Sequence, residues 1–291
     1  MSDNPQAEIA VIGGSGLYDL AGLADVQVAR IDTPFGKPSD DITVGRLHGR
    51  SVAFLPRHGR GHRLSPSEVN QRANIYALKL LGVQRIIAVS AVGSLKEHIH
   101  PLEIVVPDQL IDCTQNRDHT FFGDGVVAHV GFADPFCQDF SAVLLNACRQ
   151  VGATVHPTGA YVCIEGPQFS TKAESNLYRS WGAHVIGMTA IPEAKLAREA
   201  EICYGMLALV TDYDVWHQTA GPVSVEAVVA VLNRHAVKAR EIISRAIERL
   251  PVERSCGCAT ALDNAIITAP EQRPAETLAR LAPLLGRALG E

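Results

Sequence analysis

The stretch EIAVIGGSG, residues 8–16, decides how this chain folds. Its first residues are mostly apolar and lead straight into a glycine-rich loop. A short apolar run that ends in glycines is typical of a strand buried in a sheet that is covered on both faces. Similar apolar runs return at 51–55, 85–90, 103–106 and 206–211. These segments predict the strands of one central sheet.

Longer segments with helical spacing of apolar residues separate the runs. The first begins at Ser67 and stops at Gly82, a residue type that commonly ends helices. Further helices are predicted over 140–151, 172–181, 192–204 and 223–250, with an amphipathic tail from residue 271. The alternation predicts an α/β fold with a central mixed β-sheet flanked by helices on both faces. Because no linker or repeat divides the chain, we expect a single domain over 1–291, with residues 1–7 mobile and a C-terminal helix within 269–291.

The composition narrows the class of protein. The chain is 47% hydrophobic and carries a net charge of −5, which argues against nucleic acid or an anionic membrane as partner. Seven thinly spread cysteines do not resemble a disulfide framework, and neither a signal peptide nor a long apolar span is seen. We therefore expect a cytoplasmic enzyme.

Two loops at strand ends carry anion-binding groups. In the loop 13–16, backbone amides and the Ser15 hydroxyl can donate to phosphate, although Asp19 stands where a Rossmann fingerprint needs its third glycine. A tight turn is the alternative. The loop after the second strand presents Arg57 and His58, which suit a dianion, while a solvated basic loop is the alternative. Glycines at 59 and 61 disfavour a helix, and with it a zinc site of His58 and His62.

Two carboxyls follow the last predicted strand. Asp212 and Asp214 are two residues apart, so on an extended segment they point to the same side. They could accept N–H groups of an aminopurine, and one could act as a general acid if its pKa is raised. A metal site lacks an obvious third ligand nearby, and a solvated turn is the other alternative. In two further loops, Phe169 could stack on a flat ring and Met188 could contact a sugar. The alternative is that both side chains only pack within their own loops.

Several longer motifs occur in order along the chain. They are GGSGLYD (13–19), DTPFGKPSD (32–40), RHGRGH (57–62), NQRANIYALK (70–79), EGPQFSTKAES (165–175), MTAIPEA (188–194) and TDYDVW (211–216). Together they resemble the S-methyl-5′-thioadenosine phosphorylase family, in the trimeric branch of the purine nucleoside phosphorylases. The resemblance extends over roughly residues 8–268, and the tail beyond it varies within the family.

The resemblance implies phosphorolysis of S-methyl-5′-thioadenosine to adenine and 5-methylthioribose 1-phosphate, in methionine and purine salvage. It implies inorganic phosphate as co-substrate, no cofactor, no metal, and a homotrimer or a hexamer. It assigns phosphate binding to Ser15, Arg57, His58, Ser90, Ala91 and Thr189. It assigns the purine to Phe169, Ser170, Asp212 and Asp214, the ribose to Met188, the 5′ end to His62, and the methylthio group to Val225, Val228, Val229 and His129 of a neighbouring subunit.

Alternatives stay open at this point. A 6-oxopurine nucleoside phosphorylase or methylthioinosine phosphorylase is the nearest, but relatives selective for 6-oxopurines carry Asn at position 212. A non-catalytic nucleoside binder would not need the phosphate-site groups. The CGC tripeptide at 256–258 resembles a C-x-C motif that can form a disulfide in some archaeal relatives, and we expect the other five cysteines to be core thiols.

Overall fold

A computed structural model describes residues 4–14, 17, 22–217 and 224–290 of the protein. The helices are α1 (Gln71–Leu80), α2 (Gln138–Gln150), α3 (Lys172–Ser180), α4 (Ala190–Glu199), α5 (Val225–Arg249) and α6 (Ala275–Leu289). The strands are β1 (Ile9–Gly13), β2 (Ala24–Ala29), β3 (Ile42–Leu47), β4 (Arg50–Pro56), β5 (Arg85–Ser94), β6 (Ile104–Val105), β7 (Gln109–Cys113), β8 (Val155–His156), β9 (Ala160–Ile164), β10 (Val185–Gly187) and β11 (Cys203–Asp212).

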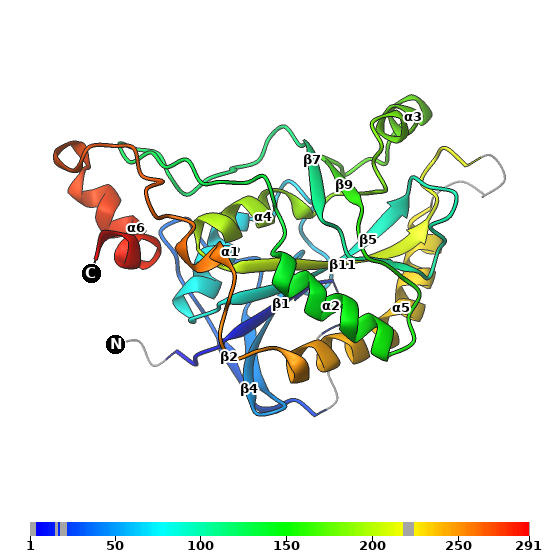
Figure 1. The fold of residues 1–291 in the computed structure, drawn as a ribbon, viewed down its shortest axis with the longest axis horizontal. Coiled ribbons are helices and arrows are strands. Elements are labelled where there is room, and N and C mark those ends of the chain that lie inside the picture. The colour runs from blue at the N-terminus through cyan, green and yellow to red at the C-terminus, as the bar shows by residue number, and fades with distance from the viewer. Residues whose placement is uncertain (1–3, 15–16, 18–21, 218–223, 291) are drawn as a thin grey trace.

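The strands form one mixed sheet with β5 at its centre (Figure 1). The main path runs β2-β3-β4-β1-β5-β10-β9-β7, and β11 pairs with β5 along almost its whole length. The strands β4, β1, β5 and β11 are parallel to their neighbours in this group, so their carboxyl ends meet at one edge of the sheet. In an open α/β sheet, ligands bind at that edge.

Helices cover both faces, and side chains alternate between them. In β1, Ala10 and Ile12 belong to a core shared with α1, α4 and α6, whereas Ile9 and Val11 belong to a core shared with α2 and α5. Buried apolar residues on both sides are the reason the strands read as continuous apolar runs. The predicted α/β fold with a mixed sheet between two helical layers is confirmed.

The clearest differences from the predicted boundaries concern two helices. The helix expected from Ser67 begins at Gln71, because the Asn70 side chain caps it by accepting the amide of Ala73. The helix expected over 192–204 is wrong at its end. It stops at Glu199, and Cys203 begins β11 by donating its amide to the carbonyl of Gln84.

The sequence reading missed several strands, namely β2, β3, β7, β8, β9 and β10. Two of these, β8 and β10, have only two or three residues and show no periodicity. The segment AYVCI of β9 did carry a readable apolar run.

Residues near both ends of the described chain pack against the core. Ala7 is buried and donates its amide to the carbonyl of Leu81, while residues 1–3 lie outside the described part. The predicted C-terminal helix is α6, which buries Leu281, Leu284 and Leu285 and lies far from α3 (Figure 1). Within the described residues, no helix has the length and apolar character needed to cross a membrane.

Candidate active site

A cavity of about 580 Å³ opens at the sheet edge where β1, β4, β5 and β11 end. The side chains that line it come from the strand ends, from α5 and from loops distant in sequence. The predicted site residues among them are Arg57, His58, His62, Ser90, Ala91, Phe169, Ser170, Met188, Thr189, Asp212, Asp214, Val225, Val228 and Val229.

Two predicted residues are not part of this lining. Ser15 lies outside the described residues. His129 does not border the cavity of its own chain, and its backbone amide pairs with the carbonyl of Ala265. Its assignment to a neighbouring subunit stays a prediction.

Arg57 lies at the inner end of the cavity in a buried ion pair with Glu193. The side chains are 2% and 0% exposed. Arg57 Nε donates to one Glu193 oxygen, and Nη2 donates to the other at 3.1 Å. Burial alone lowers the pKa of Arg57, but the Glu193 carboxylate overrides this and raises it. The guanidinium is therefore a permanent cation at the cavity.

The partners of Arg57 restrict what it can offer to a ligand. Nη1 also donates to the carbonyl of Val89 at 2.8 Å, and Nη2 to that of Ile12 at 3.4 Å. A guanidinium has five N–H donors, so among the described residues one N–H of Nη1 stays without a partner. Because Glu193 occupies the fork of Nε and Nη2, Arg57 can offer an anion this one N–H and not a bidentate pair.

His58 adjoins Arg57 and is neutral. Its Nδ1 faces the carbonyl of Leu64 at 2.9 Å and so carries the proton, which leaves Nε2 as an acceptor. Burial, followed by the nearby Arg57 charge, lowers the pKa of His58 to about 4. The ring stacks on His62 with centroids 4.3 Å apart. The neutral His58 ring therefore adds no positive charge to the cavity.

Hydroxyl groups surround the same end of the cavity. Thr189 Oγ1 donates to Ser90 Oγ at 2.9 Å, and Ser90 Oγ donates to the carbonyl of Ala91 at 3.1 Å. The Thr189 amide donates to the Tyr161 hydroxyl at 3.3 Å, and burial raises the pKa of Tyr161 to about 12. Because hydroxyl protons rotate, Ser90 and Thr189 can redirect their donors to an anion beside Arg57.

Asp212 and Asp214 lie at the other end, after a β-bulge. The register of β11 with β5 shifts between Val210 and Asp212, and Asp214 has a left-handed backbone with φ of 50°. Bulges of this kind re-aim side chains next to active sites. The two carboxyls do share one cavity, but the predicted reason was wrong. The strand ends at Asp212, and a turn brings Asp214 beside it.

Burial raises the pKa of both carboxyls. For Asp212 the Thr211 hydroxyl and the Asp214 amide partly offset the rise, and for Asp214 the Ser175 hydroxyl does so. Asp214 Oδ2 and Ser170 Oγ are buried and make no hydrogen bond of normal geometry with the described residues. Buried polar atoms without partners are rare in native proteins, so each of these two atoms is available to a polar ligand in the cavity.

The first turn of α5 gives the cavity an apolar wall. Val225, Val228 and Val229 share one face of the helix and border the cavity, as their spacing predicts. Val225 is 68% exposed and Val229 47%, so these residues are not part of the core. The buried part of α5 starts only at His235, beyond these valines.

Positioning residues were missed by sequence reasoning. Arg117 donates to the carbonyls of Met188 at 2.8 Å and Glu165 at 2.7 Å, and thereby joins the two loops that carry the aromatic and thioether groups. Glu193 belongs to the motif MTAIPEA, but the sequence alone assigned no function to this residue. A single acidic or basic residue in a loop carries no local signal of the distant partner it will meet.

A second cavity, of about 570 Å³, lies between residues 67–72 and 115–118. Its lining includes no predicted site residue and no residue of the first cavity. We place the active site in the first cavity, because that one joins a buried cation to carboxyls of raised pKa.

The fold and this cavity define an α/β protein of the phosphorylase class. The chain belongs to the phosphorylase superfamily, whose family model matches residues 8–248. It is 60% identical over 279 residues to the S-methyl-5′-thioadenosine phosphorylase of Geobacter sulfurreducens, which covers 96% of this chain and 98% of that one. For the enzyme of the same name from Koribacter versatilis the identity is 56%, with 98% of each chain covered.

Solved structures agree with the sequence relatives. A methylthioadenosine phosphorylase from an antarctic soil metagenomic library matches with a TM-score of 0.92 at 52% identity, over 96% of this chain and 99% of that one. The methylthioadenosine phosphorylase of Schistosoma mansoni in complex with adenine matches with a TM-score of 0.83 at 37% identity, over 88% and 96% of the chains.

Proposed function

We propose that the protein catalyses phosphorolysis of S-methyl-5′-thioadenosine to adenine and 5-methylthioribose 1-phosphate. The bond between C1′ and N9 breaks, its electron pair stays with the base, and a phosphate oxygen bonds to C1′. The reaction uses inorganic phosphate as co-substrate and needs no other cofactor. The names of the curated relatives and the polarity of the cavity, cationic at one end and carboxylic at the other, support the proposal.

The Arg57 end of the cavity would bind phosphate. Arg57 supplies one charged N–H, and Ser90 and Thr189 supply hydroxyl donors. Neutral His58 can accept the remaining proton of hydrogen phosphate through Nε2. A dianion held beneath the ribose stabilises the positive charge that develops at C1′ in the transition state. The sequence adds the Ser15 hydroxyl as a further predicted donor, although this residue lies outside the described part of the chain.

The carboxyl end would bind the purine. Because burial raises the pKa of Asp212, this group can hold a proton and transfer it to N7 as the base departs. The buried Oδ2 of Asp214, which lacks a regular partner, would accept the 6-amino group. This oxygen is the observation that carries the assignment, since a purine amino group supplies the missing donor. Ser170 and Phe169 would contact the ring, and Met188 the ribose.

The alternative of a 6-oxopurine substrate also has an observation in its favour. Burial raises the pKa of Asp214 too, and a protonated carboxyl donates to a carbonyl oxygen as well as it accepts from an amine. The base preference therefore needs a direct comparison of the two classes of nucleoside.

A homotrimer in the cytoplasm completes the proposal. In it, His129 of one chain would close the apolar wall of the next, next to Val225 and Val229, whose exposure within a single chain leaves them open to such a neighbour. A monomer or dimer in light scattering would remove this role of His129.

The testing experiment combines four nucleosides with purified protein. Methylthioadenosine, adenosine, methylthioinosine and inosine are each incubated with and without phosphate, and the released bases are separated by chromatography. We expect adenine from methylthioadenosine only when phosphate is present. Base release without phosphate would overturn phosphorolysis, and faster release from methylthioinosine would overturn the base assignment.

A further inference from the structure

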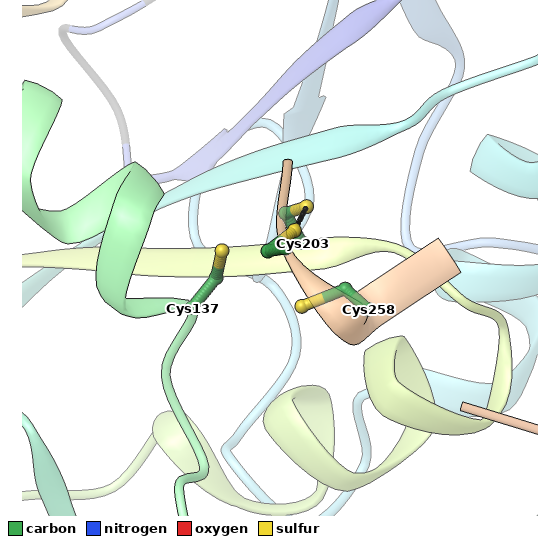
Figure 2. Close-up of side chains that lie close together, drawn as sticks. Cys137, Cys203 and Cys258 are labelled. Carbon is green, nitrogen blue, oxygen red and sulfur yellow. Dashed lines mark hydrogen bonds between the residues drawn. The ribbon is translucent and has the colours of Figure 1, made fainter. Parts of the chain in front are cut away.

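Four cysteines from three separate segments gather at one point of the fold (Figure 2). Cys137 directly precedes α2, Cys203 is the first residue of β11, and Cys256 and Cys258 follow α5. Their sulfur atoms all lie within 4.8 Å of one another. Three of the residues are buried and Cys256 is half-buried. The sequence reading separated the C-x-C pair from the other thiols, and the fold joins them.

The spacing of the sulfur atoms fits a metal ion better than two separate pairs. In a tetrahedral site with bonds of about 2.3 Å, ligand sulfurs lie about 3.8 Å apart. Here Cys203 and Cys256 are 3.3 Å apart, and the largest separation in the group is 4.8 Å, so the tetrahedral value falls between them. Two disulfides would require each sulfur atom to move toward one partner and away from the other two sulfur atoms. All four residues are free thiols in the structure.

A buried arginine lies next to the cysteine group. Arg85 is the residue paired with Cys203 across β5 and β11, its side chain is 4% exposed, and it attracts the Cys203 thiolate. Its Nη2 also donates to the carbonyls of Pro251 at 2.9 Å and Glu253 at 3.0 Å, which fixes the segment leading to Cys256. A buried cation next to the group offsets part of the excess negative charge that a tetrathiolate carries.

We propose that Cys137, Cys203, Cys256 and Cys258 bind one structural zinc ion as a tetrathiolate. Each thiol binds as thiolate, and the released protons pass to solvent. Four protein sulfurs close the coordination sphere, so no position is left for substrate. Cys203 and Asp212 occupy opposite ends of β11, about 30 Å apart at the rise of a strand. The ion joins the start of α2, the start of β11 and the segment after α5, and takes no part in the reaction.

The first test measures metal in the full-length protein, purified without chelator and with a phosphine reductant. Mass spectrometry of metals should find about one zinc per chain. The variants Cys203→Ser and Cys258→Ser should lose the zinc and melt at lower temperature. The matched control is Cys148→Ser, which changes a buried thiol of α2 outside the group and should keep the zinc.

A second test uses the wild-type chain alone, so that it does not depend on the folding of variants. After chelation, Co²⁺ should restore thermal stability and give the thiolate-to-cobalt charge-transfer bands and strong visible bands of a tetrahedral sulfur site. Alkylation of denatured, unreduced protein should modify all seven cysteines.

Several outcomes would overturn the proposal. Two disulfides in protein purified without reductant would replace the ion by covalent bonds. Seven free thiols without zinc and without a cobalt spectrum would leave an ordinary thiol cluster. Stoichiometric iron would overturn the choice of zinc, and zinc retained by both Cys203→Ser and Cys258→Ser would place the metal elsewhere.

Discussion

The backbone amide of Asp214 donates a hydrogen bond to Oδ1 of Asp212 at 2.7 Å. This contact fixes the two carboxyls of the cavity relative to each other, and it depends on the left-handed backbone of Asp214. The Thr211 hydroxyl holds the other oxygen of Asp212 at 2.7 Å. Asp212 is thus orientated by its own chain, and this is the preorganisation that its proposed role as general acid requires.

Replacing Asp212 by asparagine tests its role as the acid. The asparagine side chain would still accept the Asp214 amide, but it cannot transfer a proton to N7. We expect kcat/KM for methylthioadenosine to fall by about 10²-fold or more, in keeping with the loss of a general acid, with a smaller loss for methylthioinosine. Steady-state kinetics on both nucleosides measure the difference. An equal loss on both would contradict a role at the base, and an unchanged melting temperature would show that the fold is intact.

Gly93 in β5 lies close to both carboxyl residues of the cavity. A Cβ at this position would lie 3.0 Å from Asp212 Oδ1 and 3.2 Å from Asp214 Cβ. We expect Gly93→Ala to lower kcat/KM by about 10²-fold, because small displacements of catalytic groups have effects of this size. The control is Gly286→Ala in α6, where a new Cβ meets nothing within 4 Å. Full activity in Gly93→Ala would show that the carboxyls can shift without consequence.

The sheet and the strand-end loops were predictable because they depend on local patterns. The apolar runs of β1, β4, β5 and β11 and the polar residues directly after them place Arg57, Ser90 and Asp212 at one edge by topology alone. Parallel strands bring their ends together whatever lies between them, so these residues could be assigned to one cavity from sequence.

The partners of these residues were not predictable, because they are set by packing between distant segments. Glu193 lies 136 positions from Arg57, and Arg117 reaches two loops that lie 48 and 71 positions away. The cysteine group illustrates the same limit: C-x-C is visible in sequence, but Cys137 and Cys203 join it only through the fold. The bulge in β11 likewise depends on pairing with β5.

The ion pair of Arg57 and Glu193 makes a prediction about stability. In Glu193→Gln the shape is kept but Arg57 becomes a buried charge without a counter-charge. Breaking a buried pair in this way lowers the free energy of unfolding by about 3–5 kcal/mol. Phosphate should raise the melting temperature of the variant more than that of the wild type, since the anion replaces the lost charge. Tyr204→Phe is the control, because it removes a hydrogen bond to Glu193 without changing any formal charge. Equal melting temperatures of variant and wild type would contradict the argument.

Val228 tests the apolar wall. Threonine has nearly the same shape but adds a hydroxyl to the surface that would face the methylthio group. We expect Val228→Thr to raise KM for methylthioadenosine by about tenfold, the effect of a mismatched small group in an apolar pocket, and to change KM for adenosine much less. Competition of the two nucleosides in one reaction measures the ratio of their kcat/KM values directly. A parallel rise for both would place the 5′ group away from α5.

Glu199 makes a prediction about pH that does not depend on the reaction. Its carboxylate accepts bonds from the Thr120 hydroxyl at 2.6 Å and the Phe121 amide at 2.8 Å, but burial dominates and raises the pKa of Glu199 to about 7. Because the folded pKa lies above the unfolded value, the neutral form stabilises the fold. This contribution is complete below the unfolded pKa of 4.5 and is lost as pH rises through 7.

Glutamine is neutral at every pH, so Glu199→Gln should remove this part of the pH dependence. At pH 8 we expect the variant to be more stable than the wild type by up to about 3 kcal/mol, and near pH 4 the two should be alike. Denaturant unfolding at several pH values between these limits measures the difference. A constant difference across the range would mean that Glu199 does not titrate in this window, whereas a gap that widens with pH requires a buried carboxyl with a raised pKa.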